Sequence, residues 1–286
     1  MSLDIVESRL KEYQPKTKQE EINALKEICQ EIALCGLARS EFFKKGAFQG
    51  GTCLRILYGL KSFSEDLDFI LFKTEKCFSW EQYLKAVELE FASFGLTLEV
   101  LDRSQVEGVI KRAFLKENSF AKVLKLQHGF LPSDKQSIKI KLEIDINPPN
   151  GSSYQTHYLD YPYPFSVLCQ DMPSLFAGKC HSLLCRKYIK GRDWFDFLWY
   201  ISKKTQINYN LLSNALFQAG PFRGKKIIVN KDWLVENLQL KINKIDWKTV
   251  RLDIEAFLKA EDRKFIENWN KALFFSMIKK LEAFLL

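Results

Sequence analysis

Residues 48–72 read FQGGTCLRILYGLKSFSEDLDFILF and combine a glycine turn with two closely spaced acids. The pattern predicts a short strand, the turn, a helix at about Cys53–Leu60 and a second strand at Leu67–Phe72. Asp66 and Asp68 lie two residues apart, so an extended chain directs both carboxylates to one face. Two acids side by side suit a hard divalent cation, although acids also decorate solvent-facing strand edges.

The glycine turn, formed by Gly50, Gly51 and Thr52, precedes the predicted helix. The first N–H groups of a helix have no partner within it, and the positive end of the helix dipole lies there, so a phosphate is favoured. Arg55 could reach the same phosphate or pair with Glu65. One short helix thus joins a predicted phosphate site to a predicted metal site, which indicates Mg²⁺-dependent transfer of a nucleotide or phosphoryl group.

A third acidic position is expected on the strand Ile138–Asn147, where apolar and charged residues alternate. Its polar face carries Lys141, Glu143 and Asp145. Either acid could complete the site of a two-metal nucleotidyl transfer. Alternatively, this face is only solvated, and its lysines and acids pair across neighbouring strands. The sequence leaves both readings open.

A second charged cluster lies in AGKCHSLLCRKYIKGRDWFDFLWY, residues 177–200. Lys179 and Arg186 are seven residues apart, which places them on one helix face. Asp193 and Asp196 follow at the start of the next predicted helix, where acids complement the dipole. The cations could bind a triphosphate while the acids hold them in place. Equally, the group could consist of helix caps and ion pairs of little energetic value.

The other elements divide the chain into an α+β half and a helical half. We expect an amphipathic helix at Lys18–Lys44, broken near Gly36, and a linker at Asn150–Pro164, which is rich in turn residues. The predicted domains are residues 1–165, a mixed β-sheet with flanking helices, and residues 166–286, an α-helical bundle closing a binding cleft. The remaining predicted helices are Trp80–Phe94, Pro173–Lys187, Trp194–Lys203, Tyr209–Ala219, Trp233–Leu238, Trp247–Leu258 and Lys264–Leu285. The remaining predicted strands are Leu96–Leu101, Val109–Leu115 and Ala121–Leu126.

The composition fits a globular protein that meets polyanions. Of 286 residues, 47% are hydrophobic, and the net charge is +8, with a pI near 9.0. Such basicity suits nucleic acid or nucleoside triphosphates, though many proteins share it. The seven cysteines form no CxxC pair, which is typical of reduced thiols in a cytoplasmic protein. We expect neither a signal peptide nor a membrane span.

Several separated motifs carry a family resemblance. GGTCLRILYGLKSFSEDLDF resembles the signature of the nucleotidyltransferase superfamily typified by DNA polymerase beta. GGT…SEDLDF, KLEIDINPP and AGKCHSLLCRKYIKGRDWFDF together resemble the AbiEii/AbiGii toxin family of bacterial type IV toxin–antitoxin and abortive-infection systems. The similarity spans Phe48–Tyr200. It implies a mixed-sheet nucleotidyltransferase domain, a C-terminal helical bundle, and a nucleoside triphosphate with Mg²⁺ or Mn²⁺ in the cleft.

The resemblance also implies roles for single residues. Gly50, Gly51 and Thr52 match the turn that holds the phosphates, and Asp66 and Asp68 match the metal-binding pair. Lys141 and Glu143 match a lysine and the acid that follows it on the next motif strand. The later motifs are matched by Lys179, Asp193 and Asp196. Many family members carry Ser at the position of Gly51. Related toxins add nucleotides to the 3′ end of tRNA, so an RNA acceptor and an antitoxin partner are implied.

We therefore predict an enzyme, a cytoplasmic Mg²⁺-dependent nucleotidyltransferase that moves a nucleoside monophosphate from a nucleoside triphosphate to RNA, most naturally tRNA. Two alternatives stay open. The acceptor could be a small molecule or a protein, in which case salt-dependent binding to tRNA would be absent. The protein could also be a non-catalytic nucleotide- or nucleic-acid-binding module.

Overall fold

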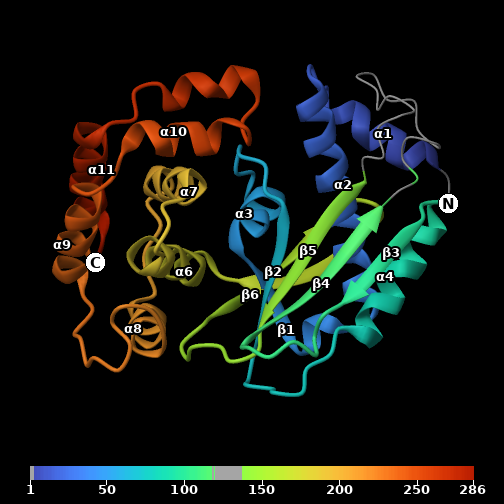
Figure 1. The fold of residues 1–286 in the computed structure, drawn as a ribbon, viewed down its shortest axis with the longest axis horizontal. Helices are drawn as coiled ribbons and strands as arrows, with labels where there is room; N and C mark the ends of the chain where they lie inside the picture. The colour runs from blue at the N-terminus through green and yellow to red at the C-terminus, as the bar shows by residue number, and fades with distance from the viewer. Residues whose placement is uncertain (1–2, 118, 120–136) are drawn as a thin grey trace. The chain divides into compact units, whose positions relative to one another are not determined.

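The computed structural model describes residues 3–117, 119 and 137–286. The chain forms two compact units, each with its own core (Figure 1). Unit 1 comprises Met1–Gly59, Phe63–Pro148 and Thr156–Cys169, and unit 2 comprises Leu60–Ser62, Pro149–Gln155 and Gln170–Leu286. Strands dominate the order of elements in the first and helices in the second. The predicted α+β class is therefore confirmed.

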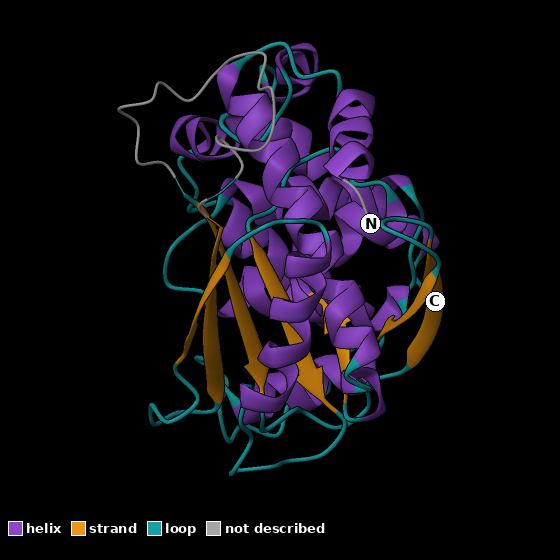
Figure 2. Ribbon diagram, turned by 90° about the vertical axis from the view of Figure 1, so that its right-hand side faces the viewer, coloured by secondary structure: helices purple, strands orange, loops and turns teal. Residues whose placement is uncertain are grey.

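The strands within the described residues form one mixed sheet in the order β3-β4-β5-β2-β1-β7-β6. Figure 2 shows the strands in orange, with helices in front of part of the sheet. The strands are β1 (Gly46–Gln49), β2 (Asp66–Leu71), β3 (Leu98–Asp102), β4 (Ile110–Glu117), β5 (Ile138–Asp145), β6 (Tyr154–Leu159) and β7 (Phe165–Gln170). β2 runs antiparallel to β1 and parallel to β5, while β4 runs antiparallel to β3 and β5. The strands β2 and β5, which carry the predicted acids, are thus neighbours.

The alternation predicted for β5 is confirmed. Its isoleucines and Leu142 are buried, whereas its charged residues are exposed or half-buried. Helix α2 (Lys18–Arg39) packs on β5, and α4 (Glu81–Ser93) packs on β3 and on α2. Because these helices cover the apolar face, the charged residues of β5, together with Arg112 and Lys116 of β4, remain on the opposite face. Lys111 and Glu117 of β4 are instead buried on the covered face.

The helices of unit 1 differ from the sequence expectation at four points, the first being that α2 ends at Arg39 rather than at Lys44. These helices are α1 (Leu3–Tyr13), α2, the short η1 (Phe42–Lys44), α3 (Gly50–Tyr58) and α4. α1 was not predicted, and α3 begins at Gly50 rather than near Cys53, so the glycines belong to its first turn. α2 continues through Gly36 without the expected break. An ideal Cβ on Gly36 would lie 2.8 Å from the Val87 Cα, which shows that this glycine serves the close approach of α2 and α4.

Unit 2 is helical beyond β7, as predicted. Its helices are α6 (Met172–Cys185), α7 (Gly191–Ser202), α8 (Tyr209–Gln218), α9 (Lys231–Ile242), α10 (Trp247–Glu255), η2 (Ala260–Ile266) and α11 (Lys271–Phe284). Five begin at a side chain that accepts a hydrogen bond from the first turn, namely Asp171, Asn208, Asn230, Asp246 and Asn270. The rings of Trp247 and Phe274 stack with centroids 3.8 Å apart, and Trp194 packs edge-on against both. Throughout the described ranges, every helix is too short or too polar to cross a membrane.

Three predicted segments need correction or fall outside the described residues. The expected linker at Asn150–Pro164 contains β6, whose half-exposed residues lack the apolar alternation of a buried strand. The single helix expected at Lys264–Leu285 is divided into η2 and α11, because Asn270 caps a new helix. The strand predicted at Ala121–Leu126 lies outside the described residues.

The close packing at Gly36 gives a stability test. A Cβ there meets the backbone of α4, which cannot move aside like a side chain, so Gly36→Ala should lower the free energy of unfolding by about 1–3 kcal/mol. Gly178, inside α6, has no described atom within 4 Å of its ideal Cβ. Gly178→Ala should therefore raise stability by about 0.5–1 kcal/mol. Urea unfolding followed by circular dichroism compares the two, and equal effects would refute the packing role of Gly36.

Candidate active site

The parallel register of β2 and β5 brings the predicted acids together in unit 1. Asp66 lies opposite Lys141, and Asp68 lies opposite Glu143. The Lys141 Nζ is 3.1 Å from the Asp66 Oδ2 and 3.4 Å from the Glu143 Oε2. One ammonium group therefore bridges carboxylates from two strands. Partial burial would lower the pKa of Lys141, but the two carboxylates outweigh it and raise that pKa above its usual value.

Arg112 is a further member of the site that the sequence reasoning missed. It lies on β4 opposite Glu143, and its Nε donates a 2.6 Å hydrogen bond to the Glu143 Oε1. Its strand was predicted, and alternation would have placed it on the polar face, but cross-strand register cannot be read from one sequence. The Glu143 carboxylate is consequently held by Arg112 and Lys141 together.

The start of α3 lies directly against the acidic strand. Gly50 has a φ of +83°, and an ideal Cβ on it would lie 3.0 Å from the Asp68 Cβ and 3.1 Å from its Cγ. A side chain at Gly50 would be strained and would also displace the Asp68 carboxylate. The Thr52 hydroxyl donates a hydrogen bond to the Asp66 carbonyl oxygen, while Gly51 lies between these residues in the first turn of α3. The predicted phosphate-binding turn therefore lies against the predicted metal-binding acids, through Gly50 beside Asp68 and the hydrogen bond from Thr52 to Asp66.

The two remaining candidates in unit 1 have other partners. The Arg55 Nε donates a 2.8 Å hydrogen bond to the Glu27 Oε2 of α2, and its guanidinium lies 4.3 Å from the centre of the Phe63 ring. Asp145 lies opposite Ile70, beyond the Asp68–Glu143 pair, and accepts a hydrogen bond from the Asn147 N–H. Burial raises the pKa of Asp145 above its usual range despite that bond. Of the two acids that the sequence left open, the register places Glu143 beside Asp68.

Unit 2 brings together the four charged residues of the second cluster. The Lys179 Nζ lies 2.8 Å from the Asp193 Oδ1 and 2.7 Å from the Asp196 Oδ2, and the Arg186 Nη1 lies 3.0 Å from the Asp193 Oδ2. Arg186 follows the last residue of α6 rather than lying within the helix. Both acids are buried, and the Lys179 side chain is only 12% exposed. Lys179 therefore has two carboxylate partners within the protein, while its role in binding a nucleotide stays a prediction.

Burial and ion pairing act in opposite directions in this cluster. Burial alone would raise the pKa of Asp193, but the cations of Lys179 and Arg186 outweigh it and hold that pKa below its usual range. Burial dominates at Asp196, whose pKa is raised despite Lys179. Burial would likewise lower the pKa of Lys179, but the two carboxylates raise it. The lysine therefore stays charged in the folded protein.

The donor groups of unit 1 fit Mg²⁺ as a partial site. Within the described part of the chain, no group of three His, Cys, Asp or Glu side chains is placed to hold a metal ion. Asp66 and Asp68 nevertheless offer two carboxylates on one face of β2. Mg²⁺ is commonly held by one or two carboxylates, with water and substrate phosphates as its other ligands. The residues are therefore suited to a cation that arrives with a phosphate.

A mixed sheet, an acidic strand and a helix that begins with glycine against that strand are the features that the sequence motifs predict for a nucleotidyltransferase. The sequence model of the family described as "Nucleotidyl transferase AbiEii toxin, Type IV TA system" matches residues 32–273. The chain belongs to this AbiEii family. The resemblance carried by the motifs is thus confirmed over most of the chain.

A solved structure shares the fold. The crystal structure of JHP933 from Helicobacter pylori has 18% sequence identity and a TM-score of 0.51, and the similarity covers 91% of this chain and 94% of that one. A second crystal structure from H. pylori, described as a "putative nucleotidyltransferase", has 17% identity, covers 89% and 94% of the two chains, and has a TM-score of 0.48. No curated protein matches the sequence.

The buried cluster of unit 2 predicts a large loss of stability on removal of its lysine. Lys179→Met would leave Asp193 and Asp196 buried without their cation, which should lower the free energy of unfolding by about 3–5 kcal/mol at neutral pH. Without Lys179 the folded-state pKa of each acid rises, so the folded variant binds protons and the deficit shrinks as the pH falls. Urea unfolding at pH 7 and at pH 5 measures both effects.

Lys187→Met is the matched control, because this exposed lysine lies close to the end of the same helix. It should change stability by no more than about 0.5 kcal/mol. A Lys179→Met variant as stable as this control would show that the buried ion pairs contribute nothing to folding.

Proposed function

We propose that the protein transfers a nucleoside monophosphate from a nucleoside triphosphate to a hydroxyl group of RNA, with the 3′ end of tRNA as the acceptor. The observation that carries the proposal is the contact of Gly50, at the start of α3, with Asp68 on the acidic strand. Membership of the AbiEii family supports the nucleotidyl transfer and the toxin role. The basic net charge supports a polyanionic acceptor.

The start of α3 binds the triphosphate of the donor. The N–H groups of Gly50, Gly51 and Thr52 belong to the first turn, where the helix leaves its donors unpaired and its dipole favours negative charge. The absence of a side chain at Gly50 leaves room for the Asp68 carboxylate against this turn, so a phosphate bound to the turn would lie next to that carboxylate. The hydrogen bond from Thr52 to the Asp66 carbonyl keeps this turn aligned with β2.

Asp66 and Asp68 would hold Mg²⁺ or Mn²⁺, with Glu143 as the third acid. Bound there, the metal supplies charge neutralisation on the phosphates and activation of the attacking hydroxyl. Lys141 and Arg112 hold the Glu143 carboxylate in place on β5. Glu143 is therefore positioned to accept the proton of the acceptor hydroxyl.

The transfer is a single displacement at phosphorus. The acceptor oxygen forms a bond to the α-phosphorus, and the bond between that phosphorus and the bridging oxygen of the pyrophosphate breaks. Pyrophosphate leaves with the electron pair, and the hydroxyl proton passes to Glu143. The protein contributes mainly positioning and charge stabilisation, as is usual for phosphoryl and nucleotidyl transfer.

Other parts of the proposal rest on the family and on unit 2. In unit 2, Lys179 and Arg186 are the cations proposed for phosphate binding, and Asp193 and Asp196 hold these cations in place. In unit 1, Arg55 is proposed to stabilise the charge of the triphosphate, and Glu27 holds its guanidinium in place. An antitoxin protein restrains the toxin, as the type IV description of the family suggests. The reduced cysteines of the chain support a cytoplasmic location.

The proposal is tested by incubating the protein with each labelled nucleoside triphosphate, Mg²⁺ and total RNA. Label in RNA would support the transfer and would identify the nucleotide. Mg²⁺-dependent nucleotide binding without labelled RNA would point to a small-molecule or protein acceptor. Absence of both binding and transfer would contradict the enzymatic reading.

Single substitutions of Asp68, Glu143 and Asp145 should show how much each acid contributes to the transfer rate. We expect Asp68→Asn to lower the transfer rate by at least about a hundredfold, because it removes charge stabilisation at the phosphates. Glu143→Gln should lower it by about 10²–10⁴-fold through loss of the proton acceptor. Asp145→Asn should cost less than tenfold, since this acid lies beyond the pair.

Single-turnover rates at saturating nucleotide measure these effects. Asp160→Asn is the control, because it removes an exposed carboxylate from the same unit. If Asp145→Asn were the more damaging variant, Asp145 rather than Glu143 would be the third acid.

The glycine at the start of α3 should be indispensable for nucleotide binding. Gly50→Ala introduces a Cβ at positive φ that also meets the Asp68 carboxylate, so we expect loss of Mg²⁺-dependent nucleotide binding. Gly59→Ala introduces similar strain at φ +72°, but its Cβ meets no described atom within 4 Å. It should lower stability by about 1 kcal/mol and leave binding intact. Equal binding losses in calorimetry would attribute the effect to strain alone.

A further inference from the structure

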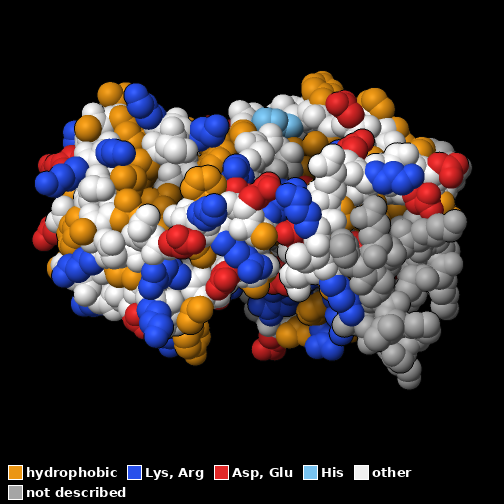
Figure 3. Space-filling model, turned by 90° about the horizontal axis from the view of Figure 1, so that it is seen from above, with side chains coloured by type: hydrophobic (Ala, Val, Ile, Leu, Met, Phe, Trp, Pro, Cys, Tyr) orange, Lys and Arg blue, Asp and Glu red, His pale blue; other side chains and the backbone are white. Residues whose placement is uncertain are grey.

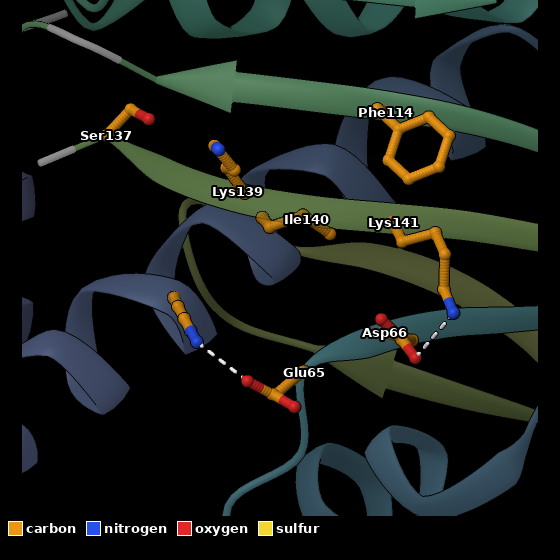
Figure 4. Close-up of a pocket in the computed structure, with 8 residues that line it drawn as sticks. Glu65, Asp66, Phe114, Ser137, Lys139, Ile140 and Lys141 are labelled. Atoms are coloured by element: carbon orange, nitrogen blue, oxygen red, sulfur yellow. Dashed lines mark hydrogen bonds and ion pairs between the residues drawn. The ribbon is translucent and has the colours of Figure 1, made fainter.

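A groove opens beside the acidic strand where β2 and β5 separate. β5 begins at Ile138, but its pairing with β2 begins only at Lys141, opposite Asp66. The edge of residues 138–140 that faces β2 is therefore unpaired within the described ladder. A cavity of about 670 Å³ lies there, bordered by Asp66 and Lys141 and extending to Lys139 (Figure 4). We call it the β5 groove, defined by Lys26, Asp66, Phe114, Lys139 and Lys141.

The β5 groove and the glycine turn lie on opposite sides of the acidic strand. In the sheet, β2 has β5 on one side and β1 on the other, and α3 follows β1 directly. The attacking and leaving oxygens of a displacement at phosphorus lie roughly in line, on opposite sides of the phosphorus atom. If the donor triphosphate occupies the turn next to Asp68, the groove next to Asp66 is on the side of the acceptor.

The β5 groove contains a lysine, Lys139, to which the described residues offer no counter-charge. Lys26 pairs with Glu65 at 3.0 Å, and Lys141 pairs with Asp66. We find no ion pair of Lys139 with any residue that the structure describes. Its cross-strand neighbour on β4 is another lysine, Lys116, which pairs with Glu99. Like charges directly opposite each other are unfavourable, so this place favours an incoming anion.

The charge at the groove is a local feature. On the face of the molecule seen in Figure 3, basic and acidic side chains are interspersed. Net charge alone would therefore not direct a polyanion to the acids on β2. Lys139 does provide such direction, because it lines the same groove as Asp66 and has no ion pair within the described residues. Phosphate contacts of this kind fix the register of a nucleic acid on a protein.

An aromatic ring lies beside the lysines. Phe114 on β4 is half-buried and lies opposite Lys141, on the polar face of the sheet (Figure 4). The Arg103 guanidinium carbon lies 5.7 Å from the centre of its ring. Aromatic rings between basic side chains are the usual surface on which single-stranded bases stack. The groove therefore offers contacts for both a base and a phosphodiester.

We propose that the β5 groove binds the 3′-terminal stretch of a single-stranded nucleic-acid acceptor. A terminal base stacks on Phe114, a backbone phosphate lies against Lys139, and the terminal hydroxyl reaches Asp66 and Glu143. This inference rests on the proposed function and deepens it, since it assigns the acceptor to a particular place. The competing occupant is the base of the donor nucleotide.

The test measures RNA binding without catalysis. Fluorescence anisotropy of a 5′-fluorescein single-stranded RNA is recorded at several salt concentrations, without nucleotide or metal. Lys139→Ala should reduce the slope of log K against log salt by about 0.7, the value for one lost phosphate contact on a single strand. Phe114→Leu should weaken binding by about tenfold, and Phe114→Tyr should retain it because the ring remains.

Lys85→Ala is the charge-matched control. This exposed lysine lies on α4, which packs on the sheet through the covered apolar face, so its removal should leave the salt slope unchanged. Circular dichroism confirms that all variants are folded. Equal salt slopes for Lys139→Ala and Lys85→Ala would overturn the proposal.

A parallel titration with a fluorescent nucleoside triphosphate and Mg²⁺ separates the two occupants. Loss of nucleotide binding in Lys139→Ala and Phe114→Leu, with RNA binding intact, would overturn the proposal and assign the groove to the donor. Wild-type protein that transfers nucleotide to a small molecule and binds no RNA would also overturn it, while the transfer itself stands. RNA binding that responds as expected in a protein that transfers nothing would support the groove and refute the proposed function.

Discussion

The pairing of β2 with β5 in one parallel register is the constraint on which the site of unit 1 depends. It places Asp68 beside Glu143 and Asp66 beside Lys141. A shift by one residue would turn every charged side chain of β5 toward α2 and expose its isoleucines. The apolar alternation of β5 opposes that shift, because its buried side chains fill the space under α2. Hydrophobic packing on one face therefore sets the chemistry on the other.

The same register solves an electrostatic problem. Asp66, Asp68 and Glu143 would repel one another if they faced solvent without cations nearby. Lys141 lies between two of these acids, and Arg112 approaches from the next strand. Each partner is partly exposed, so each ion pair contributes little to folding by itself. Their value lies in orientation, because they hold carboxylates in place before any substrate or metal is present.

The sequence predicted the components of the fold and site better than their pairing. The acids of β2, the alternation of β5 and the helical second half could all be recognised, because each depends on a local period or motif. The sequence could not predict that Arg112 lies beside Glu143, or that Glu143 rather than Asp145 lies beside Asp68. Both depend on the register between strands that are distant in the chain. The sequence predicted a break in α2 at Gly36 because glycine has a low helix propensity. That glycine instead allows the close contact with α4, and helix propensity carries no information about such tertiary contacts. β6 was missed because its residues are only half buried.

The parallel pairing of β2 and β5 also bears on how the protein is synthesised. A growing chain carries Asp66 and Asp68 long before the ribosome reaches Ile138, and the two strands must close a long loop before they pair. Until then Lys141 and Glu143 have not been synthesised, and β2 lacks the strand that pairs with it on the β5 side. A chain released before this point has no assembled site. For a member of a toxin family, incomplete translation products would consequently be harmless to the cell that makes them.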